Sequence, residues 1–197
     1  MACNLTKGRT LSCNQAMGGI KRIYFSVWTK TFWEGLDYNA TDVNQIDDIT
    51  AISVAQFDTR PNLSSMTVTA TAGDQTAGTP AYYQQAADLV LQKLDVASLP
   101  YLKELGDSRM VAWVLDMNNR IYVLGLKDGV RVTGGTALTG TSRADMSGFT
   151  ISISGEETDW MYAVKYDAAA TELTANFPWT GITTPGNITD LAQVVPA

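Results

Sequence analysis

Two pairs of adjacent carboxylates, Asp47-Asp48 and Glu156-Glu157, are the first side chains in this sequence that could carry out chemistry. A glycosidase needs two carboxylates at a defined separation across a cleft. Adjacent residues on a strand point to opposite faces of the sheet, so neither pair can aim both side chains into one site. We therefore predict that these acids are solvated turn charges and not a catalytic dyad.

The stretch Asp116-x-Asn118-x-Arg120 begins like a calcium-binding loop, in which alternate residues supply oxygen ligands. Arg120 then stands where that pattern needs an oxygen ligand. The glycine that should follow it and the late glutamate of such loops are both missing. We therefore predict a hairpin turn at this position.

A Gly/Thr-rich stretch runs from Gly134 to Ser142 and has the composition of a phosphate-binding loop. No Gly-Lys-Ser/Thr follows it, and no helix is expected to start behind it. We interpret it as a flexible connection between strands. The basic pair Lys21-Arg22 lies at the base of a predicted strand, where surface salt bridges are the expected role.

The chain contains no histidine, which removes the commonest general base and the commonest metal ligand. Its two cysteines, Cys3 and Cys13, cannot complete a tetrahedral zinc site by themselves. Free thiols are favoured over a disulfide between them for a protein made in the cytoplasm. The sequence thus predicts a non-enzyme with no catalytic, cofactor-binding or metal-binding residue, and no cofactor.

The overall composition favours a protein that works in an assembly over one that coats nucleic acid or spans a membrane. The chain has 197 residues, of which 45% are hydrophobic and only 17% are charged, and its net charge is −6. A soluble protein usually has about 25% charged residues, so much of the surface is expected to be covered in an assembly. An acidic chain without clustered Lys and Arg does not suit nucleic-acid coating. No apolar run reaches membrane-spanning length, and we expect no signal peptide at residues 1–15.

Most of the chain has the residue pattern of β-strands. Residues 110–115 and 121–124 are β-branched or aromatic runs on either side of the predicted turn, which indicates a hairpin. Phe149, Ile151 and Ile153 alternate with hydroxyl residues, as in a strand with one buried face. Further strands are expected at 20–28, 46–57, 66–72 and 160–166. Residues 73–80 have the composition of a polar hairpin tip.

Helix is possible in two segments of the chain, residues 81–95 and 99–105. Residues 81–95 fit a helical stripe as well as an alternating strand, and a strand paired with 66–72 is slightly favoured. A short helix is expected at 99–105, with Ser98 as its N-cap, Pro100 in its first turn and Gly106 just after its end.

The predicted organisation is an N-terminal arm at 1–19, a mainly β domain at 20–166 and a C-terminal extension at 167–197. Residues 191–195 of the extension are apolar, and an apolar tail of this kind usually docks on its own chain or on a neighbour. The sequence leaves both possibilities open.

The order of these elements resembles that of the tail tube proteins of long-tailed bacteriophages. The likeness covers residues 66–155. Val114-Leu-Asp-Met-Asn-Asn-Arg-Ile-Tyr-Val-Leu-Gly125 looks like a hairpin found in phage structural proteins, and the stretches from Leu126 and from Thr139 are similar to the segments that come after that hairpin in such proteins. The resemblance implies two packed antiparallel sheets with one short flanking helix and extended N- and C-terminal arms.

The same resemblance implies a virion structural protein, assembled in the host cytoplasm, whose copies join edge to edge into stacked rings, usually of six. Its partners would be copies of itself and other virion proteins, with no membrane and no small-molecule substrate. DNA would pass through an acidic lumen without specific binding, because like charge repels phosphate. The lumen-lining acids cannot be named from the sequence.

Two other functions remain open at this stage. A capsid decoration protein would also be β-rich and extended at both ends. A carbohydrate-binding β-sandwich is suggested by the five tryptophans, although tryptophans in strands more often belong to a core. These tryptophans are Trp28, Trp33, Trp113, Trp160 and Trp179.

Overall fold

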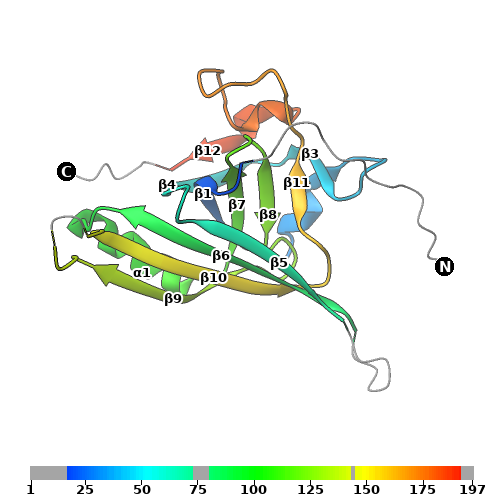
Figure 1. Cartoon of the computed structure of the whole chain (residues 1–197). Coiled ribbons are helices and arrows are strands. Elements are labelled where there is room, and N and C mark those ends of the chain that lie inside the picture. The colour runs from blue at the N-terminus through cyan, green and yellow to red at the C-terminus, as the bar shows by residue number, and fades with distance from the viewer. Residues whose placement is uncertain (1–16, 73–79, 143–144, 192–197) are drawn as a thin grey trace.

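A computed structural model describes residues 17–72, 80–142 and 145–191. Two β-sheets pack face to face, and one short helix lies against the smaller of them (Figure 1). The mainly β, sandwich-like fold predicted from the sequence is confirmed. Outside the described residues lie most of the predicted N-terminal arm, with Cys3 and Cys13, and nearly all of the predicted hairpin tip at 73–80.

The larger sheet has eight strands in the order β12-β4-β1-β7-β8-β11-β3-β2. Most neighbours are antiparallel, but β11 with β3 and β12 with β4 are parallel pairs, which the predicted antiparallel sheets did not include. The strands are β1 Ile20–Val27, β2 Leu36–Tyr38, β3 Gln45–Ile49, β4 Ile52–Asp58, β7 Met110–Asp116, β8 Ile121–Leu124, β11 Tyr162–Val164 and β12 Ile188–Asp190.

The smaller sheet has four strands in the order β5-β6-β10-β9, and every neighbouring pair is antiparallel. Helix α1, Leu99–Asp107, lies beside β9. The strands are β5 Ser65–Thr71, β6 Tyr82–Gln92, β9 Arg131–Leu138 and β10 Gly148–Glu157. Short 3-10 helices are η1 Phe32–Gly35, η2 Val96–Ser98, η3 Trp179–Gly181 and η4 Pro185–Asn187.

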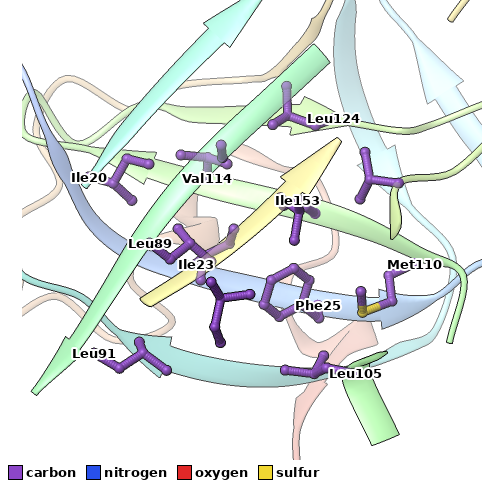
Figure 2. Close-up of a cluster of buried hydrophobic side chains, with 14 of the residues drawn as sticks. Ile20, Ile23, Phe25, Leu89, Leu91, Leu105, Met110, Val114, Leu124 and Ile153 are labelled. Atoms are coloured by element: carbon purple, nitrogen blue, oxygen red, sulfur yellow. The ribbon is translucent and has the colours of Figure 1, made fainter. Parts of the chain in front are cut away.

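Strand β7 lies at the centre of the larger sheet and is buried on both faces, as its apolar sequence requires. Alternate residues serve two cores. Ala112 and Val114 face the smaller sheet, where they pack with residues of β1, β6, β10 and α1 (Figure 2). Trp113 and Leu115 face the opposite side, where the chain after β11 covers them.

The C-terminal segment contributes to this second core. Trp179 and Ile182 are buried, and the Trp179 ring lies 5.5 Å from the Trp113 ring in an edge-to-face contact. Strand β12 then pairs with β4 of the larger sheet. Within the predicted C-terminal extension, residues 177–190 thus pack on the larger sheet, whereas most of residues 168–176 stay exposed.

Several boundaries differ from the predictions. The strand expected at 46–57 is two strands, β3 and β4, separated by Thr50 and Ala51. The strand expected at 160–166 is reduced to β11. The ambiguous segment 81–95 contains strand β6, as favoured, and it pairs with β5.

The helix begins at Leu99 with Pro100 in its first turn, as predicted, but it ends two residues later than predicted. Ser98 makes no side-chain capping hydrogen bond because a 3-10 turn leads directly into α1. Gly106 lies inside the helix, which continues to Asp107. Leu102 and Leu105 pack against the core between the sheets, and these contacts stabilise the longer helix, which includes Gly106 and Asp107.

Candidate assembly interface

The two margins of the smaller sheet are long and open within the part of the chain that the structure describes. Strand β5 forms one margin, has seven residues and contains no charged side chain. Strand β9 forms the other, has eight residues and is charged only at Arg131, its first residue. Nearly all of β9 is exposed. Open strand margins without charge are templates for pairing with another chain.

The backbone groups that face these margins are set by the alternation along each strand. On β6, the Val90 N–H donates to Ser64 Oγ (3.0 Å) and the Val90 carbonyl accepts from Arg60 N–H (2.9 Å), so Val90 faces the β5 side. Asp88, Ala86 and Gln84 therefore face β5 too. Their partners on β5 are Ser65, Thr67 and Thr69, which leaves Met66, Val68 and Ala70 with backbone groups directed to the open margin.

Backbone groups alternate in the same way on the β9 side of the sheet. The Lys93 N–H donates to the Ser147 carbonyl, so alternate residues of β6 bond to β10, and the intervening residues of β10 bond to β9. Gly135 and Ala137 of β9 then direct their N–H and C=O groups to the open margin.

The outer face of the smaller sheet is covered with hydroxyl groups. Its only acidic side chains among the described residues are Asp88 and Glu156, both exposed. The Ser152 hydroxyl donates to Asp88 at 2.6 Å. This face is polar and built mainly from short side chains. The hydroxyl residues are Ser65, Thr67, Thr69, Thr71, Thr136, Thr150, Ser152 and Ser154.

The acidic pairs weighed as catalytic are split, as the strand geometry predicted. Asp47 accepts hydrogen bonds from Asn39 and Gln45, whereas Asp48 accepts from Thr184, and both lie in strand β3. The hydrogen bond from Gln45 is the main cause that lowers the pKa of Asp47. At Asp48 desolvation is the largest single effect and raises the pKa, but the hydrogen bonds from Thr184 and from the Ile49 N–H together outweigh it, so the pKa is lowered. Asp47 therefore holds nearby residues, and Asp48 holds the distant segment at Thr184. Both acids lie in a strand and not in the expected turns.

Glu156 and Glu157 separate even more clearly. Glu156 is exposed on the outer face, while Glu157 is only 3% exposed between the sheets. The Glu157 carboxylate accepts hydrogen bonds from the N–H groups of Lys127 (3.3 Å) and Asp128 (2.9 Å). Burial raises the pKa of this carboxyl, and the two N–H donors oppose the rise. The prediction that it was a solvated charge was wrong, because β10 turns Glu157 inward.

A second buried polar residue, Gln85 of β6, was not singled out in the sequence. Its side-chain oxygen accepts the Gly125 N–H at 2.8 Å, and Gln85 is 2% exposed. Together Gln85 and Glu157 hold the turn after β8 against the smaller sheet. A polar residue between Tyr83 and Ala87 on the inward face of the alternation was the available signal.

The same turn is held from its other side. Lys127 forms an ion pair with Asp159, and hydrogen bonding to Lys127 holds the pKa of the Asp159 carboxyl below its usual range. The Trp28 indole N–H donates to the Lys127 carbonyl at 3.1 Å, and the Arg109 guanidinium lies over the Trp28 ring. This network joins the two sheets.

The remaining sequence candidates have structural roles. Asp116 accepts hydrogen bonds from the N–H groups of Asn118 and Arg120, which confirms the predicted hairpin turn. Lys21 pairs with Glu172 and Arg22 with Asp58, both on the surface, which confirms the predicted salt bridges.

The predicted Gly/Thr loop was wrong over its first half. Gly134 and Gly135 lie inside β9, paired with Ser152 and Ile151 of β10. The absence of side chains on these glycines leaves that stretch of the β9 margin bare.

The described residues contain no cluster of three or more potential metal ligands. No helix in the described ranges has the length and apolarity that a membrane crossing requires. Comparisons with protein-family models, with curated proteins and with solved structures gave no match to this chain.

Proposed function

We propose that this protein is a virion structural protein whose copies join through the margins of the smaller sheet into closed rings that stack as a phage tail tube. The observation that carries the proposal is the pair of long margins, β5 and β9, which carry a single charge between them, Arg131. Such margins are a liability in a monomer, and pairing in a ring removes them.

The direction of the two margins supports a ring. Every neighbour in the order β5-β6-β10-β9 is antiparallel, so β5 and β9 run in opposite directions. When β9 of one copy meets β5 of the next copy in the same orientation, the new pair is also antiparallel. Each copy then uses two different surfaces, and such head-to-tail contacts close into rings.

The outer face of the smaller sheet would line the lumen of this ring. The proposal assigns Asp88 and Glu156 as the acids that face the DNA, with Arg131 as the one basic residue near them on that face among the residues that the structure describes. Short hydroxyl side chains offer no extended cationic groups to hold phosphates, which suits a surface along which DNA slides. The partners proposed are further copies of this chain and other virion proteins, and the site of action is the virion.

Electron microscopy of the purified protein at high concentration tests this function. Rings or tubes of uniform width are expected for the natural sequence and for Ala70→Val, which keeps the backbone N–H at the β5 margin. Ala70→Pro removes that N–H without breaking a bond to β6, and it should abolish the rings while circular dichroism stays unchanged. Dispersed monomers or trimers of the natural protein would overturn the proposal and favour a capsid decoration protein.

A further inference from the structure

A pocket of about 310 Å³ lies between helix α1 and the smaller sheet, beside strand β9 (Figure 1). Leu99 and Leu102 line it from the helix, and Phe149 and Ile151 line it from β10. Phe149 and Ile151 belong to the core between the sheets, whereas Leu99 is 48% exposed. The pocket is thus an apolar edge of the core that lies open to solvent.

Strand β9 leaves its side of this pocket nearly bare. Gly135 and Ala137 line the pocket, are exposed and have no side chain beyond Cβ. Among the described residues, and apart from its own chain neighbours, a Cβ placed on Gly135 would meet only the Thr150 carbonyl oxygen, at 3.1 Å. The space beside Gly135 and Ala137 is therefore open toward the β9 margin.

Strand β5 of the next copy, which the proposed ring places at this margin, carries apolar side chains on the matching face. Met66 and Val68 direct their backbone groups to the β5 margin, and Gly135 directs its groups to the β9 margin. All three belong to the inner face of the sheet, since Met66 pairs with buried Ala87 and Gly135 with buried Ile151. Residues that exchange backbone bonds lie opposite each other with their side chains on one face. The two inner faces therefore join without a mismatch.

We propose that Met66 and Val68 of the next copy fill the pocket between α1 and β9. The inference rests on the proposed ring and assigns its register. Bonds between margin-facing residues allow only registers that differ by two residues. One of these, with Met66 opposite Ala137 and Val68 opposite Gly135, sets all seven residues of β5 against residues 132–138 of β9. A shift by two in either direction moves at least one residue of β5 past the end of β9.

The two side chains suit the pocket in size and polarity. Among the described residues that line it, Lys103 is the only charged one, so the space favours an apolar occupant. Val68 lies beside the glycine, where no side chain competes with it. The flexible side chain of Met66 adapts to the irregular space beside α1. Helix α1 thereby becomes part of the contact between copies, and the core of one copy continues into the next.

Two substitutions of exposed residues on α1 test the pocket. Leu99→Asp places a charge in it, whereas Tyr101→Asp, at a residue that is 47% exposed and lies outside the pocket, is the matched control. The protein concentration at which rings form, measured by sedimentation, should rise by on the order of tenfold for Leu99→Asp and stay unchanged for the control. Rings that form equally well in both variants would overturn the inference and leave the proposed ring intact.

Cross-linking tests the register without altering the pocket, and it replaces the first test if Leu99→Asp fails to fold. In the proposed register Thr67 of one copy lies opposite Thr136 of the next in a pair without backbone bonds. Their Cα atoms would be about 4.5 Å apart, which a disulfide can span. Thr67→Cys with Thr136→Cys should therefore give covalent oligomers on oxidation, in a chain that also carries Cys3→Ser and Cys13→Ser. Thr69→Cys with Thr136→Cys, shifted by two residues, should not.

The outcomes separate this inference from the function on which it rests. Rings of the natural protein without the Thr67–Thr136 cross-link, or with the shifted cross-link instead, would overturn the assigned register alone. A natural protein that forms no rings would overturn the proposed function and this inference together.

Discussion

The two sheets of this protein end in different ways. The larger sheet ends in β12 and β2, strands of three residues each, and both carry an aspartate, Asp190 and Asp37. The smaller sheet ends in β5 and β9, strands of seven and eight residues with long uncharged stretches. Short and charged margins resist pairing with other chains, whereas long uncharged margins promote it. One polypeptide thus protects one sheet and leaves the other ready to be extended.

The sheets also differ in what their free faces do. The far face of the larger sheet is covered by Trp179 and Ile182, so this sheet is buried on both sides near its centre. The outer face of the smaller sheet carries hydroxyl groups and stays exposed. The larger sheet is therefore packed on both faces, whereas the smaller sheet keeps one face open to solvent.

The largest effect is expected in the larger sheet, at Trp113. Replacing this fully buried ring with alanine in Trp113→Ala should lower the free energy of unfolding by about 3–5 kcal/mol, because it leaves a cavity beside Trp179 and frees the Ser26 hydroxyl that accepts its N–H. Urea unfolding measures the loss. Trp160→Ala, at a half-exposed ring, is the matched control, and equal losses would contradict the assigned roles.

A smaller effect is expected where the two sheets are joined. Gln85→Leu leaves the Gly125 N–H buried without an acceptor and should cost about 1–3 kcal/mol in urea unfolding. Gln84→Leu, one residue earlier on the exposed face, should change stability by less than about 0.5 kcal/mol. Similar values for both variants would show that the polar contact between the sheets adds no stability.

The stability that the contact between the two sheets provides should also depend on pH, through Glu157. Its folded-state pKa is raised by burial, so the folded protein takes up this proton at a higher pH than the unfolded chain does. The natural protein should therefore lose stability relative to Glu157→Gln as the pH rises from the ordinary glutamate range through the raised pKa. The acids with lowered pKa values are common to both proteins and cancel in this difference. A difference that grows in favour of the natural protein with rising pH would contradict the account.

The smallest effect is expected on the outer face of the smaller sheet. Asp88→Asn removes a charge from an exposed side chain that accepts a hydrogen bond from the Ser152 hydroxyl. The free energy of unfolding should therefore change by less than about 0.5 kcal/mol. Thermal unfolding of the dispersed protein measures it. A loss above about 1 kcal/mol would mean that this face takes part in holding the fold.

Strands β5 and β10 of the smaller sheet and the central hairpin were predictable from the sequence, because strict alternation and a turn with Asp116 are local signals. The 3-10 turn before α1 and the split between β3 and β4 were not, because tertiary contacts decide them. The packing of Trp179 was also missed, since residues 167–190 have no periodicity and their burial depends on a distant face of β7.

The candidate interface was predictable only in part. The uncharged run of β5 was visible in the sequence, but Gly134 and Gly135 have the composition of a loop, and only pairing with β10 makes them a sheet margin. The roles of Gln85 and Glu157 depend on which face of a strand turns inward at the junction, and a single-sequence pattern does not fix that where a polar residue interrupts the alternation.

The central claim is that β9 of one copy pairs with β5 of the next, and a mixing experiment with two blocked variants tests it most directly. Ala70→Pro blocks the β5 margin and Ala137→Pro blocks the β9 margin, so each variant alone should stay a monomer in native mass spectrometry. Mixed together, they retain one intact β9–β5 contact and should form a one-to-one heterodimer with no larger species. Dimers of either variant alone, or a mixture that remains monomeric while the natural protein assembles, would contradict the claim.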